Sequence, residues 1–129
     1  MKKTKKGFTL VELLVVIAIL ATLSTVAIVS YVSFVNKADE SAAKAEAEQI
    51  DLLIETALVS NDAIKIKDEL WIIKTQSGYE ATTTPQNDAT DMLSDFADFT
   101  GQFSNSDGKL MYTSRGYIVD VDTRTTTKQ

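Results

Sequence analysis

The sequence of 129 residues contains no cysteine and no histidine, a single proline and only five glycines. The absence of cysteine excludes disulfides, and the absence of both residues excludes most metal sites and every catalytic dyad built on histidine or cysteine. A folded domain of this chain must therefore be held by packing alone. No glycine lies between Gly7 and Gly78, and the proline is Pro85. The first half of the chain thus contains nothing that would interrupt a long helix.

Charge is also scarce over one stretch. From Phe8 to Val29 there are 22 residues with one charged side chain, Glu12, and four lysines precede this run at positions 2, 3, 5 and 6. As a helix the run would span roughly 33 Å, enough to cross a bilayer core of about 30 Å. Because no basic cluster follows, we expect a single membrane pass with the N-terminus in the cytoplasm and the body outside. An ordinary secretory signal peptide is the alternative, but its best cleavage site, Thr25-Val26-Ala27, is poor.

Glu12 is the one carboxylate in this apolar run, and carboxylates inside membrane segments are costly and usually functional. One interpretation is local, because a negative charge in the first helical turn suits the positive end of the helix. The other is that Glu12 awaits a positive partner. If the chain were cut after Gly7, the new amino group of Phe8 would lie one turn away, in the same chain or in a neighbour. A buried ion pair between subunits would fix their register.

The nine residues Lys5-Lys6-Gly7-Phe8-Thr9-Leu10-Val11-Glu12-Leu13 resemble the processing site of type IV pilins and pseudopilins, and the resemblance covers about residues 5–31. It implies that a membrane-embedded prepilin peptidase cuts after Gly7 and N-methylates Phe8. It also implies that Glu12 neutralises the N-terminus of an adjacent subunit. The expected partners are further copies of the chain, other pilins, and an inner-membrane assembly platform with a motor ATPase. The expected product is a filament at the cell surface or outside the cell.

The sequence predicts a leader of residues 1–7, a membrane and filament-core helix of residues 8–29, and a head domain of residues 30–129. Without the four leader lysines, nine basic side chains remain against 18 acidic ones, a net charge of −9. This charge argues against an electrostatic nucleic-acid binder. An enzyme has no nucleophile–base pair to use, and we expect no cofactor.

We expect the helix to continue to about residue 59, because residues 37–48 are rich in strong helix formers. Apolar residues then recur with helical spacing at Ala43, Ala47, Ile50, Leu53, Ile54, Ala57 and Leu58. A helix over residues 8–59 would be roughly 78 Å long, too long for a compact body of this size. Its first half should therefore lie in a membrane or against other copies. Many pilins carry glycine or proline there, whereas the weak points here are Thr22, Ser24 and Thr25.

The rest of the chain predicts an antiparallel sheet with one short helix. We expect strands over residues 63–67, 70–75, 79–83, 109–113 and 117–122, with Asp120 facing outward in the last. The short helix should start at Asn87 or Asp88 and bury Ala89, Met92, Leu93, Phe96 and Phe99. Residues 101–108 are interpreted as a polar loop and residues 123–129 as a frayed tail. The predicted fold is α+β, with the C-terminal half of a long helix on a small antiparallel sheet, which resembles the ladle of pilins.

Candidate ligand sites are few. Asn105-Ser106-Asp107-Gly108 has the polar spacing of a calcium-loop fragment, but the glutamate of a full loop is missing and the same residues form an ordinary turn. We interpret Asp88, Asp91, Asp95 and Asp98 as a solvated helix face rather than a metal site.

Two functions remain. The preferred one is the structural subunit of a type IV pilus or pilus-like filament. The alternative is a minor pseudopilin or tip subunit of a type II secretion or competence pseudopilus, acting as assembly initiator or binding module. Copy number along the filament would distinguish them.

Overall fold

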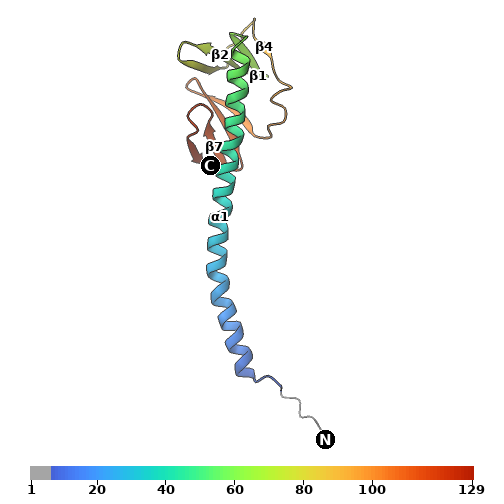
Figure 1. Ribbon diagram of the computed structural model, residues 1–129, viewed down its shortest axis with the longest axis vertical. Coiled ribbons are helices and arrows are strands. Elements are labelled where there is room, and N and C mark those ends of the chain that lie inside the picture. Colours follow the sequence, from blue (N-terminus) through green and yellow to red (C-terminus); the bar gives the residue numbers. More distant parts are fainter. Residues whose placement is uncertain (1–6) are drawn as a thin grey trace. The chain divides into compact units, whose positions relative to one another are not determined.

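The computed structural model describes residues 7–129, so most of the predicted leader lies outside the described residues (Figure 1). One helix, α1 (Leu10–Leu58), precedes all the strands. The strands are β1 (Ala63–Lys67), β2 (Leu70–Thr75), β3 (Gly78–Thr82), β4 (Thr90–Asp91), β5 (Gln102–Ser106), β6 (Lys109–Ser114), β7 (Tyr117–Asp120) and β8 (Thr126–Lys128). The predicted α+β arrangement is confirmed. The chain divides into one unit that ends at Lys37 and a second, Ala38–Gln129, which we call the head unit.

The part of α1 in the first unit is exposed from residue 10 to residue 34. It is helical throughout, including at the three hydroxyl residues expected to weaken it. Each of these hydroxyls donates to a helix carbonyl one turn back: Thr22 to Ile19 at 2.8 Å, Ser24 to Leu20 at 2.7 Å, and Thr25 to Thr22 at 2.7 Å. These three hydroxyls are thereby satisfied inside the helix, which suits a membrane environment.

The part of α1 in the head unit has the predicted apolar stripe. Ala43, Ala47, Ile50, Ile54 and Leu58 are buried, and Leu53 and Ala57 are partly buried. Ile50, Ile54 and Leu58 pack with apolar residues of β1, β2, β3 and β6, whereas Ala43 and Ala47 pack with residues of β7. The small side chains of Ala43 and Ala47 accommodate the larger Tyr117 and Val119 opposite them.

The head unit contains two four-stranded sheets rather than the single sheet expected. Their strand orders are β3-β2-β1-β4 and β5-β6-β7-β8. All pairings are antiparallel except that of β1 with β4. The backbone N–H of Ala81 in β3 donates to the carbonyl of Gly108, in the turn between β5 and β6, at 2.7 Å. That bond joins the two sheets at one point.

The predicted short helix after Asn87 or Asp88 is wrong. This segment contains the two-residue strand β4, followed by turns. A tertiary contact fixes the start of the segment, where the N–H of Met92 donates to the carbonyl of Lys65 in β1 at 3.0 Å, and turn bonds follow, among them one from the N–H of Phe96 to the carbonyl of Met92 at 3.3 Å. Phe96 is buried, with its ring centroid 5.9 Å from that of Phe103 and edge-on to it. Packing of this aromatic pair and pairing with β1 determine the conformation, not the local helical spacing.

Two further predictions are wrong, because residues 101–108 are not a loop and residues 123–129 are not a frayed tail. Residues 102–106 form β5, which continues into β6 through a two-residue turn. The turn residues Asp107 and Gly108 have φ angles of 53° and 82°, as in the primed turns that suit hairpins. At the C-terminus, β8 pairs with β7 and Thr126 donates to Glu40 of α1 at 2.8 Å.

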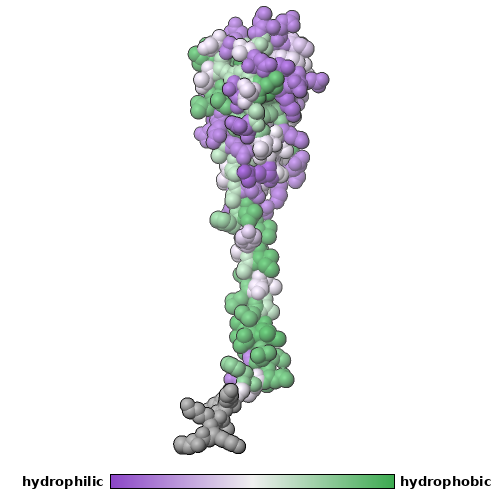
Figure 2. All heavy atoms as spheres, turned by 90° about the vertical axis from the view of Figure 1, so that its right-hand side faces the viewer, coloured by the Kyte–Doolittle hydropathy of each residue, from purple (hydrophilic) through white to green (hydrophobic). Residues whose placement is uncertain are grey.

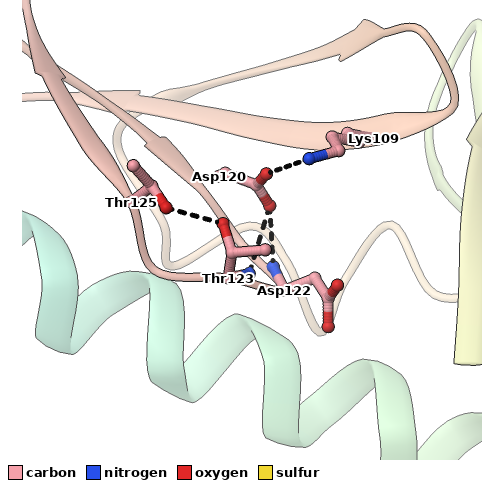
Figure 3. A network of polar contacts seen from close by, with 5 residues as sticks. All are labelled: Lys109, Asp120, Asp122, Thr123 and Thr125. Carbon is pink, nitrogen blue, oxygen red and sulfur yellow. Dashed lines mark hydrogen bonds and ion pairs between the residues drawn. The ribbon is translucent and has the colours of Figure 1, made fainter.

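Asp120 was expected to face outward, and this is also wrong, because it is 6% exposed. Figure 3 shows its carboxylate accepting hydrogen bonds from Lys109 Nζ at 3.1 Å and from the backbone N–H groups of Asp122 and Thr123 at 3.2 Å each. Burial raises the pKa of Asp120, but these donors outweigh it and hold the pKa below its ordinary value. The alternating pattern failed because the chain turns at Asp120 instead of continuing as a strand.

Candidate assembly site at the start of the helix

Thr9 and Glu12 together determine where α1 begins. The Thr9 backbone N–H and hydroxyl both donate to Glu12 Oε2, each at 2.9 Å, and the Glu12 backbone N–H donates to Thr9 Oγ1 at 3.3 Å. Thr9 therefore occupies the N-cap position and Glu12 the third helical position of a capping box. The reciprocal bonds satisfy donors that the first turn of a helix would otherwise leave open.

This arrangement uses only half of the Glu12 carboxylate. Oε2 accepts both bonds from Thr9, whereas within residues 7–129 no hydrogen bond or ion pair to Oε1 is formed. The bonds to Thr9 hold the carboxylate at the helix start. The second oxygen remains able to accept a hydrogen bond from a group outside this chain.

Gly7 and Phe8, the predicted cleavage and methylation positions, lie just before the helix in non-helical conformation and are exposed. A Cβ added at Gly7 would have nothing within 4 Å, so no packing in the described chain requires glycine there. Phe8 is 89% exposed. The peptide bond between the two residues is thus open to an approaching protein.

The surroundings of Glu12 are apolar. Phe8, Val11, Leu13, Val15 and Val16 line a shallow hollow with it. Figure 2 shows hydrophobic residues over most of the first unit on the face drawn and many hydrophilic ones over the head unit. By length and composition, α1 is the one helix within residues 7–129 that is able to cross a membrane.

Sequence reasoning missed Thr9, although the spacing Thr9-Leu10-Val11-Glu12 before an apolar run is itself the signature of a capping box.

The segment considered for calcium is the β5–β6 turn. In that turn Asn105 Oδ1 accepts the N–H of Gly108 at 3.0 Å instead of pointing to an open site. Across residues 7–129, no group of three or more acidic side chains is arranged to hold a metal ion.

Comparison with known families gives one match. Residues 2–28 match the family described as the prokaryotic N-terminal methylation motif. The chain carries the class III signal peptide of type IV pilins. No curated protein and no solved structure matches the chain.

The matched residues include all three predicted site residues, Gly7, Phe8 and Glu12, as well as Thr9. The motif supports a type IV pilin-like or pseudopilin precursor, and it points to a structural family rather than to an enzyme. It suggests polymerisation with other pilins and processing by a prepilin peptidase. The arrangement of one long N-terminal helix and a β-sheet region is consistent with a pilin fold.

Proposed function

We propose that this chain is the structural subunit of a type IV pilus or pilus-like filament. It is inserted in the cytoplasmic membrane with its N-terminus inside, cleaved after Gly7 and N-methylated at Phe8. It then polymerises through the first part of α1. A motor ATPase and an inner-membrane platform supply the work of extraction.

The observation that carries the proposal is an apolar helix that is exposed on every side and that begins within the matched methylation motif. Residues 10–34 are all exposed, and apolar side chains surround the helix. A helix that is apolar all round is stable only when lipid or other apolar helices surround it. Lipid surrounds the helix before assembly, and the helices of neighbouring copies surround it afterwards.

We expect Glu12 to determine the axial register of neighbouring subunits when other copies replace lipid around the helix. In the single chain, its carboxylate is held by Thr9 through Oε2, and we expect the same in lipid. On assembly, the free Oε1 accepts the ammonium group of Phe8 from a neighbouring copy. A misplaced neighbour would leave both charges unpaired in an apolar environment, so the pairing selects one axial position over the others.

The experiment is an intact-mass measurement on the protein co-expressed with a prepilin peptidase. A product that starts at Phe8 and is heavier by one methyl group supports the proposal. Retention of residues 1–7 makes the protein a plain membrane-anchored domain, and a cut near Ala27 makes it a secreted one. Either result would refute the filament proposal.

Electron microscopy of the same cells then determines the role. Long surface filaments in which this chain is the main component identify a pilus subunit. Short filaments, or a chain present in a few copies, identify a pseudopilin or tip subunit.

A further inference from the structure

Residues 122–129, which follow β7 and contain β8, are all of polar types. β8 pairs with β7, and the side chains of Arg124 and Thr126 reach α1. Thr126 is partly buried, and the other residues of this segment are exposed. We call residues 122–129 the β8 strap. Because the strap buries no apolar side chain, the hydrophobic effect contributes little to holding it, and polar contacts must do so.

The first of these contacts joins the strap to the beginning of the head part of α1. The hydroxyl of Thr126 donates to Glu40 Oε1 at 2.8 Å, and Lys44, one turn further along α1, donates to the same oxygen at 2.8 Å. The bonds from Lys44 and Thr126 hold the pKa of Glu40 below its ordinary value. The contact is therefore strongest while Glu40 is ionised.

The second contact lies further along α1, at a buried carboxylate. Arg124 donates to Asp51 Oδ2 at 2.9 Å, and the hydroxyl of Tyr79 in β3 donates to Oδ1 at 2.7 Å. Asp120 and Asp122 are near enough to raise the pKa of Tyr79 together with Asp51, so Arg124 supplies a positive charge to an acidic neighbourhood. Protonation of Asp51 would remove the ion pair with Arg124 but leave an acceptor for Tyr79.

The third contact fixes the turn that leads into the strap. Figure 3 shows Asp120 accepting hydrogen bonds from the backbone N–H groups of Asp122 and Thr123, while Lys109 of β6 donates to its second oxygen. These donors outweigh the effect of burial on Asp120, so the ionised form is favoured here as well. Each of the three contacts thus has an ionised carboxylate as its acceptor.

The backbone of the strap makes further bonds. The N–H of Arg124 donates to the carbonyl of Asp120 at 2.8 Å, and the N–H of Gln129 donates to the carbonyl of Gly116 at 2.9 Å. β8 has three residues and lies at the edge of its sheet. So short an edge strand, without apolar packing, is only marginally stable. The three carboxylate contacts therefore decide whether the strap stays in place.

We propose that acid releases the β8 strap: protonation of Glu40, Asp51 and Asp120 detaches residues 122–129 while both sheets stay folded. The pKa values of Glu40 and Asp120 are lowered by folding, so their contacts are complete above the unfolded pKa and are lost as pH falls through the folded one. Val121, just before the strap, is fully buried, and the apolar core loses no member when the strap detaches. The opening is therefore local, and it leaves the edge of β7 without its partner strand.

Hydrogen exchange followed by mass spectrometry tests the release on the full chain in detergent micelles. Each exchange rate is divided by the intrinsic rate of an unstructured peptide at the same pH, which removes the direct effect of pH on the chemistry. From pH 6 to pH 3 we expect protection of the β8 strap to fall about tenfold or more, because hydrogen bonds to charged acceptors are about twice as strong as those to neutral ones. Protection of β1 and β2 should change less than about threefold, since the apolar core covers these strands.

Two variants that remove charge assign the effect to the carboxylates. Glu40→Gln and Asp51→Asn each keep an oxygen that accepts a hydrogen bond but lack the negative charge. Each should lower protection of the strap at pH 6 about fivefold and reduce its further fall toward pH 3. Glu48→Gln, the matched control, removes an exposed charge from the same helix and should exchange like the natural chain. Unchanged protection of β1 and β2 establishes that the variants fold.

The outcomes are distinct. Loss of protection that is confined to the strap in acid, and that both variants reproduce in part at pH 6, supports the release. Protection of the strap that is constant from pH 6 to pH 3, or that falls equally over the whole head unit, overturns it. Natural exchange in both Glu40→Gln and Asp51→Asn also overturns it, because the charges then do not hold the strap. None of these results depends on filament formation, so the proposed function stands or falls separately.

Discussion

Replacing Glu12 in two ways separates its two roles at the helix start. Glu12→Gln removes the charge but keeps an oxygen that can accept the bonds from Thr9, since glutamine also serves in capping boxes. Glu12→Ala removes both the charge and the cap. Thr9→Val removes the two bonds that involve the threonine hydroxyl while leaving the Glu12 charge in place.

The expected magnitudes differ for the two roles. Loss of a threonine N-cap costs about 1 kcal/mol, and fraying of one turn of a helix held by lipid or neighbours should reduce assembly less than tenfold. Loss of one partner of a buried ion pair costs about 3–5 kcal/mol and should lower the equilibrium constant for adding a subunit roughly 100- to 4,000-fold. We therefore expect Glu12→Gln and Glu12→Ala to be similarly deficient, and Thr9→Val to be close to the natural chain.

The assay measures filaments sheared from cells against the pool of processed subunit in the membrane. Processing should be largely intact in all three variants, because Gly7 and Phe8 are unchanged. Natural filament yield from Glu12→Gln would refute the pairing of Glu12 with a neighbouring Phe8. If Glu12→Gln assembles and both Glu12→Ala and Thr9→Val fail, the capping box is the function of Glu12 in assembly.

Three further predictions concern the head. The fragment Ser30–Gln129 should be soluble, monomeric and cooperatively folded by circular dichroism and proton NMR; aggregation would contradict a self-contained head. In that fragment, Tyr79→Phe should lower the free energy of unfolding by about 1–2 kcal/mol in urea titrations, because the Tyr79 hydroxyl donates to the buried Asp51 carboxylate at 2.7 Å; an unchanged midpoint would refute this contribution. Its stability should fall below about pH 4, because the pKa values of Glu46 and Asp120 are lower in the folded state than in the unfolded chain. The stabilisation is complete above the unfolded pKa and is lost as pH falls through the folded one, so a midpoint that is constant from pH 6 to pH 2.5 would count against it.

The repeat of apolar residues along the sequence, helical in the first half and alternating in the second, predicted the helix and most of the strands. The seven apolar residues spaced from Ala43 to Leu58 predict a helix, because only a helix brings all of them to one side. The strand bounds at residues 63–67 and 70–75 agree with the structure. The helix starts two residues later than predicted, because the cap at Thr9 excludes Phe8 and Thr9.

The failures have a common physical origin. Phe96 and Met92 have helical spacing, but the buried aromatic contact of Phe96 and the bond from Met92 to β1 outweigh a weak local preference. Asp120 is charged and was therefore placed outside, yet its partners come from Lys109 in β6 and from the chain that follows it. Polar residues buried by distant partners have no signal in local patterning.

The candidate site was predictable to a different degree. Gly7, Phe8 and Glu12 could be proposed as site residues from the sequence, because a processing motif is a continuous stretch of the chain. The role of Thr9 was overlooked, although its spacing to Glu12 was visible.

The last residues of the chain have a consequence for the order of events during synthesis. Arg124 donates to Asp51 at 2.9 Å and Thr126 donates to Glu40 at 2.8 Å, so two helix residues made early find part of their partners among the last residues made. Contacts across such long loops form late in folding. The anchor is therefore complete and able to enter the membrane well before the head can close. A chain that stops short of residue 124 would carry an intact anchor but would lack β8 and the bonds from Arg124 to Asp51 and from Thr126 to Glu40. We therefore expect the head to close fully only after the C-terminal residues have been made, when the anchor is already complete.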